Sequence, residues 1–248
     1  MNTTPVADLS TIEEELHSVT PALIEAYEDA AQPPELHTAT PEILVESILR
    51  LLSVLRQKDG LGAQPDAPGT RDISSLSNYG IRLLADLTAW SAALKQQSAV
   101  NTLRELTYAF ALWAARQEAE ISDLQPVVDA LAFVANRVKS PGILEDLYQA
   151  ACDLQNAVDP LLSQDFDRSN PGRPWRLLVL NRAIIATRSH QPLLMEAAFQ
   201  VLTELLPEDA ENFFREGMEQ MDALDYPGKV RLVMEKYYQL WCAPKNLH

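Results

Sequence analysis

The prolines of this chain stand where helices begin, and this placement constrains the fold more than any other feature of the sequence. Proline has a fixed φ angle and no backbone N–H, so the first turn of a helix tolerates it and the interior does not. Thr40-Pro41, Ser140-Pro141, Gln191-Pro192, Leu206-Pro207 and Tyr226-Pro227 each precede an apolar stripe at helical spacing. The sequence therefore predicts one helix after another.

Apolar residues recur every three or four positions along most of the chain, which is the pattern of amphipathic helices. The stretch 175–187 is apolar on most sides, which is typical of a helix surrounded by others. Ser10 to Glu13 has the spacing of a capping box, and Thr20-Pro21 predicts an interruption of the first helix. After that first helical stretch, which begins near residue 9, we expect helices over 41–58, 74–96, 98–117, 123–138, 141–158, 175–187, 192–205, 207–221 and 227–241. The predicted fold class is all-α, a multi-helix bundle or a short solenoid-like stack of antiparallel helical hairpins.

The longest break in the helical pattern lies at residues 59–72. Its first part, from Asp59 to Gly69, contains three of the eight glycines and two prolines. Such a composition is typical of a flexible connection. We interpret 1–58 as an acidic N-terminal helical segment, 59–72 as a flexible loop, and 73–248 as the main helical domain, one continuous all-α unit.

The charge balance excludes some classes of partner. The chain of 248 residues is 47% hydrophobic, which is enough for a proper core, and its 20 basic and 35 acidic residues give a net charge of -15. An acidic surface repels phosphate backbones, so nucleic acid is not an expected partner. No stretch approaches the roughly 20 apolar residues that span a bilayer, so membrane insertion is not expected either.

The first residues of the sequence and its two cysteines predict the cellular compartment of the protein. The first eight residues have neither the basic start nor the apolar run of a secretory signal. Cys152 and Cys242 lie on or beside apolar helical stripes, as buried thiols in a reducing compartment do. We therefore expect a cytoplasmic protein.

No motif in the sequence predicts catalysis, and no catalytic residue, metal ligand or cofactor is assigned. Glu14 to His17 has the Glu-x-x-His spacing of a di-iron bundle, but such a site needs this motif twice. Asp165, Asp167 and Ser169 match the first ligands of a calcium loop, whereas Arg176 occupies the position of its glutamate. We do not expect an enzyme, although one built from dispersed residues stays open.

The one basic region of the chain begins at Arg168. Five arginines and no acidic residue lie between residues 168 and 195, whereas no Lys or Arg precedes Arg50. One interpretation is that these arginines hold acidic helices of the same chain, such as the N-terminal arm. The other is that Arg168, Arg173, Trp175 and Arg176 form a docking site for an acidic motif, since arginine beside tryptophan is common in binding hot spots.

The last helix is the second candidate surface. Tyr237, Leu240 and Trp241 continue an apolar stripe, while Tyr238 points away from its centre. The preceding helix adds the aromatic and methionine side chains Phe213, Phe214, Met218 and Met221. Such residues line adaptable binding grooves and also fill ordinary cores.

The function predicted from the sequence is a non-catalytic protein-binding adaptor, assembly factor or regulatory subunit that acts through a helical surface. Its partner is another protein, and its oligomeric state does not follow from the sequence. The predicted partner-binding residues are Arg168, Arg173, Trp175, Arg176, Tyr237, Tyr238 and Trp241. One alternative is a helical bundle that binds a hydrophobic small molecule in an interior cavity, with or without catalysis. Another is an acidic surface that mimics a polyanion and occupies the nucleic-acid site of a basic protein.

Overall fold

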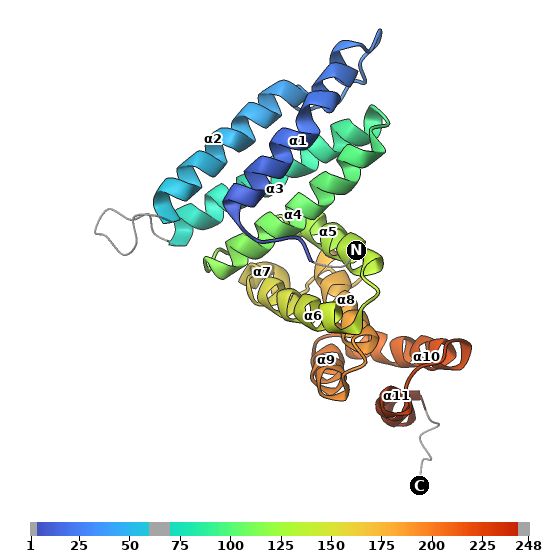
Figure 1. The fold of residues 1–248 in the computed structure, drawn as a ribbon. Helices are drawn as coiled ribbons and strands as arrows, with labels where there is room; N and C mark the ends of the chain where they lie inside the picture. The colour runs from blue at the N-terminus through green and yellow to red at the C-terminus, as the bar shows by residue number, and fades with distance from the viewer. Residues whose placement is uncertain (1–3, 60–69, 243–248) are drawn as a thin grey trace. The chain divides into compact units, whose positions relative to one another are not determined.

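A computed structural model describes residues 4–59 and 70–242 and confirms the all-α class. Within these ranges the chain forms eleven helices and no strand, apart from one isolated parallel bridge between Ile121 and Val158. The helices are α1 (Leu9–Glu28), α2 (Pro41–Asp59), α3 (Thr70–Ala93), α4 (Gln97–Arg116), α5 (Leu124–Arg137), α6 (Pro141–Asn156), α7 (Pro160–Ser163), α8 (Pro174–Arg188), α9 (Pro192–Leu205), α10 (Pro207–Ala223) and α11 (Gly228–Cys242) (Figure 1). None of these helices combines the length and the apolar character needed to cross a membrane.

The predicted interruption at Thr20-Pro21 is wrong, because α1 continues through Pro21. The missing N–H of proline removes one helical hydrogen bond. Leu16, Thr20 and Leu23 are all buried on the same stripe, so burial on both sides of the proline keeps the helix intact. The hydroxyl of Thr20 also donates to the carbonyl oxygen of Leu16 at 2.9 Å.

The start of α1 is capped by Asp8 rather than by the predicted capping box at Ser10. The Asp8 carboxylate accepts hydrogen bonds from the backbone N–H of Thr11 at 2.9 Å and from its hydroxyl at 3.0 Å. These bonds favour the ionised form and lower the pKa of Asp8. The cap thus lies two residues before the predicted one, and the helix itself forms as predicted.

The described chain packs as two units. The N-terminal unit comprises Thr4–Arg137 and Asp153–Phe166, and the C-terminal unit comprises Val138–Cys152 and the chain from Asp167 onward. Within the N-terminal unit, α1 packs on α4 and α2 packs on α3. The division of the chain into 1–58, 59–72 and 73–248 stays a prediction. Most of the predicted loop 59–72 lies outside the described residues, and the helices beside it reach Asp59 and begin at Thr70.

The core of the N-terminal unit is built around α3 and α4, which lie side by side beneath α1 and α2 (Figure 1). Gly80 of α3 allows a close approach, because its α-carbon faces the ring of Phe110 and the side chain of Leu51. Trp90 is buried and donates its indole N–H to the carbonyl oxygen of Ala39 at 2.8 Å. This bond fixes the chain that enters α2 against α3.

The C-terminal unit contains the helix predicted to be surrounded by others. On α8, buried side chains point in several directions around the axis, among them Leu178, Val179, Ala183 and Ile185. The three helices that follow, α9 to α11, pack around the buried rings of Phe199 and Phe214.

Candidate partner-binding site

The predicted arginine cluster lies against the first turn of α10. Arg173 forms an ion pair with Glu208 at 3.1 Å and also donates to the carbonyl oxygens of Arg168 and Asn170 at 3.3 and 3.2 Å. Its side chain is only 8% exposed. The carboxylate of Glu208 also contacts Arg168 at 3.6 Å. These ion pairs join the loop 165–173 to the start of α10. The position of Glu208 in the first turn of that helix is also favourable, because acidic residues there complement the helix dipole.

Arg176 completes this network with a bidentate ion pair. Its Nε and Nη2 donate to the two carboxylate oxygens of Asp209 at 2.8 and 2.6 Å, and both side chains are largely buried. Trp175, which lies between Arg173 and Arg176 in the sequence, is buried. The arginines therefore hold an acidic helix of the same chain, and that helix is α10 instead of the N-terminal arm. Their role as a docking site for an acidic partner stays a prediction.

The predicted residues of the last helix are half-buried. The ring of Tyr237 lies 5.2 Å from the rings of Phe199 and Phe214, and its hydroxyl donates to the carbonyl oxygen of Glu196 at 3.3 Å. Burial raises the pKa of Tyr237 above its ordinary value. Tyr238 and Trp241 are also half-buried. The aromatic residues thus contribute to the core of this helix group, and the structure does not gather them with the arginine cluster.

Three leucines on α9 and α11 are strongly exposed, and of these the sequence predicted only Leu240 as part of a candidate surface. Leu193, Leu232 and Leu240 are 82%, 67% and 63% exposed. Leu193 precedes Glu196 by three residues, and Leu232 and Leu240 lie four residues on either side of Lys236. Residues at these spacings share one side of a helix. Lys236 and Glu196 form an ion pair at 2.9 Å, so the three leucines surround one contact between the two helices.

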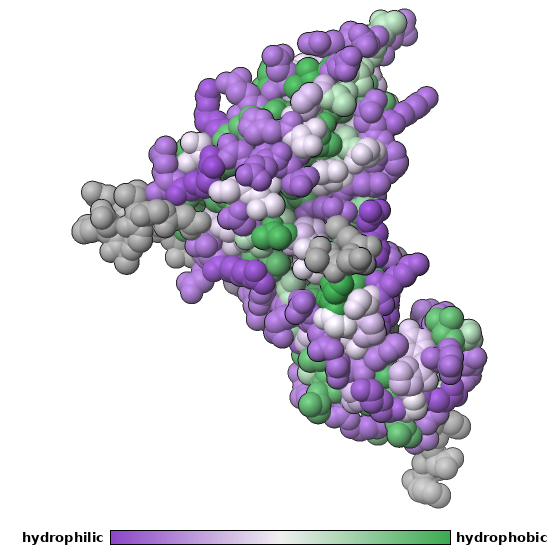
Figure 2. All heavy atoms as spheres, in the orientation of Figure 1, coloured by the Kyte–Doolittle hydropathy of each residue, from purple (hydrophilic) through white to green (hydrophobic). Residues whose placement is uncertain are grey.

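We call these five residues, Leu193, Glu196, Leu232, Lys236 and Leu240, the α9/α11 surface. Figure 2 shows hydrophobic residues on the outside of the molecule where Figure 1 places α9 and α11. A signal for this surface existed in the sequence, because Leu232, Lys236 and Leu240 form a second stripe at i, i+4 and i+8. Leu240 was predicted to lie on the stripe that contains Val230, Val233 and Met234, and the structure buries these three residues.

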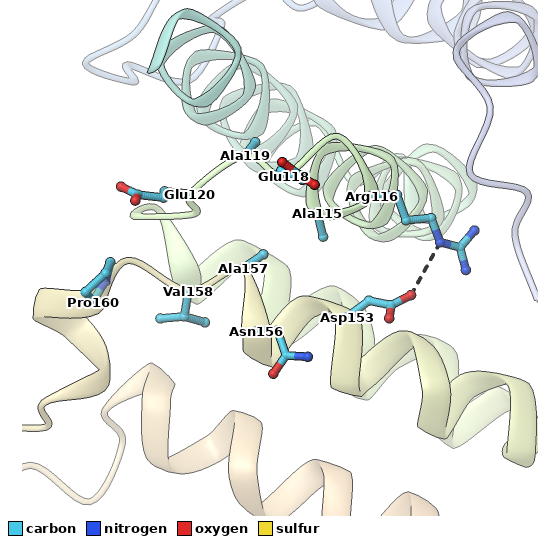
Figure 3. A pocket seen from close by; sticks show the side chains of 10 residues that line it. All are labelled: Ala115, Arg116, Glu118, Ala119, Glu120, Asp153, Asn156, Ala157, Val158 and Pro160. Carbon is cyan, nitrogen blue, oxygen red and sulfur yellow. Dashed lines mark hydrogen bonds and ion pairs between the residues drawn. The ribbon is translucent and has the colours of Figure 1, made fainter. Parts of the chain in front are cut away.

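The N-terminal unit contains a hollow of about 520 Å³ between the end of α4 and residues 153–160. Figure 3 shows Glu118 and Glu120 on one side of this hollow, Asn156 on the other, and the Arg116–Asp153 ion pair at one edge. No His, Cys, Ser or Thr is among the lining residues Ala115, Arg116, Glu118, Ala119, Glu120, Asp153, Asn156, Ala157, Val158 and Pro160. The lining therefore offers no hydroxyl, thiol or imidazole nucleophile, and its ionisable groups are Arg116 and the carboxylates of Glu118, Glu120 and Asp153.

Asn78 holds the loop that borders this hollow. Its amide nitrogen donates to the carbonyl oxygens of Ser74 and Glu120, and its amide oxygen accepts from the backbone N–H groups of Ser122 and Asp123, all within 3.1 Å. A buried side-chain amide with all of these bonds made is a structural clamp. Among the described residues, no group of three or more His, Cys, Asp and Glu side chains is arranged to hold a metal ion.

Comparison of the chain with protein-family models, with curated proteins and with solved structures finds no match. The function proposed below therefore depends on the geometry and chemistry of the surfaces just described.

Proposed function

We propose that this protein is a non-catalytic protein-binding module, an adaptor, assembly factor or regulatory subunit, whose partner binds at the α9/α11 surface. The observation that supports the proposal is the grouping of three exposed leucines around the Lys236–Glu196 ion pair. Single exposed leucines are common on soluble proteins, whereas several exposed leucines grouped around one contact between two helices are typical of an interaction site. The cytoplasm is the proposed compartment, and it fits Cys152 and Cys242, which form no disulfide with each other.

The aromatic core beneath this surface supports the same role. Phe199, Phe214 and Tyr237 fix α9 and α11 against one another, and Tyr237 bonds the backbone of Glu196 within the surface itself. The leucines would therefore lie on helices that are already held in place, so less conformational entropy would be lost when a partner binds.

Affinity capture from the native lysate with single-surface variants tests the proposal. The full-length chain should retain a stoichiometric partner that survives high salt, because apolar contacts are not screened by ions. Leu232→Glu and Leu240→Glu should lose that partner, since each places a charge in the apolar patch. Leu161→Glu is the matched control, because Leu161 is 69% exposed but lies on α7 in the N-terminal unit.

Two results would contradict the proposal. One is a partner that both α9/α11 variants retain as well as the unmodified chain does. The other is the absence of any stoichiometric partner at low and at high salt. Circular dichroism spectra and melting temperatures of the variants should match those of the unmodified protein, because the substituted side chains are exposed.

A further inference from the structure

The N-terminal unit contains an apolar groove between α2 and α3, with a volume of about 410 Å³. Ile43 and Val54 of α2 and Tyr79 of α3 line it and are 54%, 38% and 45% exposed, and Leu76 completes the α3 side. Ile43 and Val54 lie eleven positions apart, which is about 16 Å along a helix at 1.5 Å per residue. The groove is therefore long enough for about three turns of a docked helix.

The charge of the chain is concentrated on the unit that contains this groove. By sequence, the N-terminal unit holds 22 of the 35 acidic and 9 of the 20 basic residues, a net charge of -13. The C-terminal unit holds the other 13 acidic and 11 basic residues, a net charge of -2. The N-terminal unit as a whole therefore has a negative field, which attracts cations and repels anions.

The charged residues that line the groove are Glu46 and Arg50. Glu46 on the rim pairs with Arg50 at 2.9 Å, but both side chains are mostly exposed, and an exposed pair of this kind contributes little. Glu42 is exposed one turn before Glu46. Both carboxylates are thus accessible to basic side chains on an incoming helix.

We infer that the α2/α3 groove binds a cationic amphipathic helix of a partner protein. Its apolar residues would lie along Ile43, Val54, Leu76 and Tyr79, and its Lys and Arg residues would contact Glu42 and Glu46. This groove is distinct from the α9/α11 surface, so each can fail without the other. The inference adds a second interaction surface and states the chemistry of its partner.

A displayed library of helical peptides of about 14 residues tests the inference on the full-length protein. Apolar residues are fixed at three- and four-residue spacing, and the remaining positions vary among Lys, Arg, Glu and Gln. Selected peptides should carry net positive charge and should bind more weakly at high salt. Selection of acidic or uncharged peptides would overturn the inference.

Variants of the protein then locate the binding site. Tyr79→Ser and Val54→Ser remove apolar contacts without adding charge, and Glu46→Lys reverses the rim charge. Each should weaken a selected peptide by about tenfold or more, as loss of a hot-spot contact does. Leu161→Ser, which alters an exposed leucine of the same unit outside the groove, and Leu232→Glu should leave the affinity unchanged. Equal affinity of the groove variants and the unmodified protein would overturn the inference.

Of two further measurements, one does not depend on the folding of the variants and the other shows whether the groove has a different occupant. A photo-crosslinking residue in the peptide should label α2 and α3 of the unmodified protein, and labelling elsewhere would overturn the inference. Sedimentation velocity of the protein without peptide should show no dimer that Val54→Ser abolishes. Such a dimer would assign the groove to a second copy of this chain and would also overturn the inference.

Discussion

At the scale of single residues, two helical glycines determine how closely their neighbours approach. A Cβ atom on Gly80 would lie 2.6 Å from two ring carbons of Phe110 and 2.8 Å from a methyl carbon of Leu51. A Cβ atom on Gly217 would lie 2.6 Å from the sulfur of Met234. Methionine can change rotamer to make room, whereas a phenylalanine ring in a close-packed core cannot. Gly80 is thus the stricter requirement of the two.

Gly80→Ala should lower the free energy of unfolding by about 1–3 kcal/mol, the usual cost of overpacking a core. Gly142→Ala is the matched control, because Gly142 also lies in a helix and no atom comes within 4 Å of its Cβ position. Alanine is the better helix former, so this control should be neutral or slightly stabilising. Urea unfolding of both variants measures the difference, and equal stabilities would contradict the role given to Gly80.

The raised pKa of Glu105 should make the free energy of unfolding depend on pH. Burial raises its pKa above the ordinary value of 4.5, although the nearby Arg137 opposes the shift. A carboxyl group with a raised pKa in the folded state binds its proton more tightly there than in the unfolded state. Its contribution to stability therefore falls as the pH rises from about 4.5 through the raised value.

Glu105→Gln should remove that fall. The free energy of unfolding of the variant, relative to the unmodified protein, should be higher at pH 7 than at pH 4, as measured by urea unfolding at both values. Glu219→Gln, which alters an exposed carboxylate of α10, serves as the control. A variant whose relative stability stays constant or declines toward pH 7 would show that the contact with Arg137 outweighs burial.

At the scale of elements, the positions of the helices in the sequence could be predicted more fully than the packing of one helix on another. Proline placement and apolar periodicity gave the fold class and most helix ranges, because both act within a few residues. The continuation of α1 through Pro21 could not be predicted, since it depends on the burial of Leu16 and Leu23 by other helices. The short α7 was missed for a similar reason, because its side chains are largely exposed and no apolar stripe marks it.

The candidate site was harder to predict than the helices for the same physical reason. The arginines of 168–176 were found as a cluster, but their partners Glu208 and Asp209 are more than thirty residues away, and only packing brings them together. The leucines of the α9/α11 surface were present in the sequence as a second stripe. Which of two stripes on α11 is buried depends on where α9 and α10 lie.

The ion pair between Arg176 and Asp209 should stabilise the C-terminal unit measurably. A double-mutant cycle with Arg176→Ala and Asp209→Ala should give a coupling energy of about 1–3 kcal/mol, because the pair is bidentate and largely buried. The same cycle on Arg50 and Glu46, an exposed pair within α2, should give about 0.5 kcal/mol or less. Similar coupling energies for both pairs would show that the network at α10 adds no stability.

At the scale of the whole molecule, the uneven charge distribution has a consequence for stability. Like charges on the N-terminal unit repel one another, and added salt screens that repulsion. Raising NaCl from about 0.02 M to about 0.15 M should therefore slow hydrogen exchange across the N-terminal unit. The C-terminal unit, with its nearly balanced charge, should respond less and provides an internal control. A uniform response, or faster exchange in the N-terminal unit, would contradict this reasoning.

The bridge between Ile121 and Val158 also determines when the N-terminal unit can complete its folding during translation. The N–H of Ile121 donates to the carbonyl oxygen of Ala157 at 2.7 Å, and its carbonyl oxygen accepts from the N–H of Asp159 at 2.9 Å. Both partners are translated after all of α5 and α6. On the ribosome, the N-terminal unit thus stays incomplete at this edge until residue 159 has emerged, even though its first five helices are already made. Nascent chains that stall between α5 and α7 are therefore the form of this protein that chaperones and proteases should recognise first.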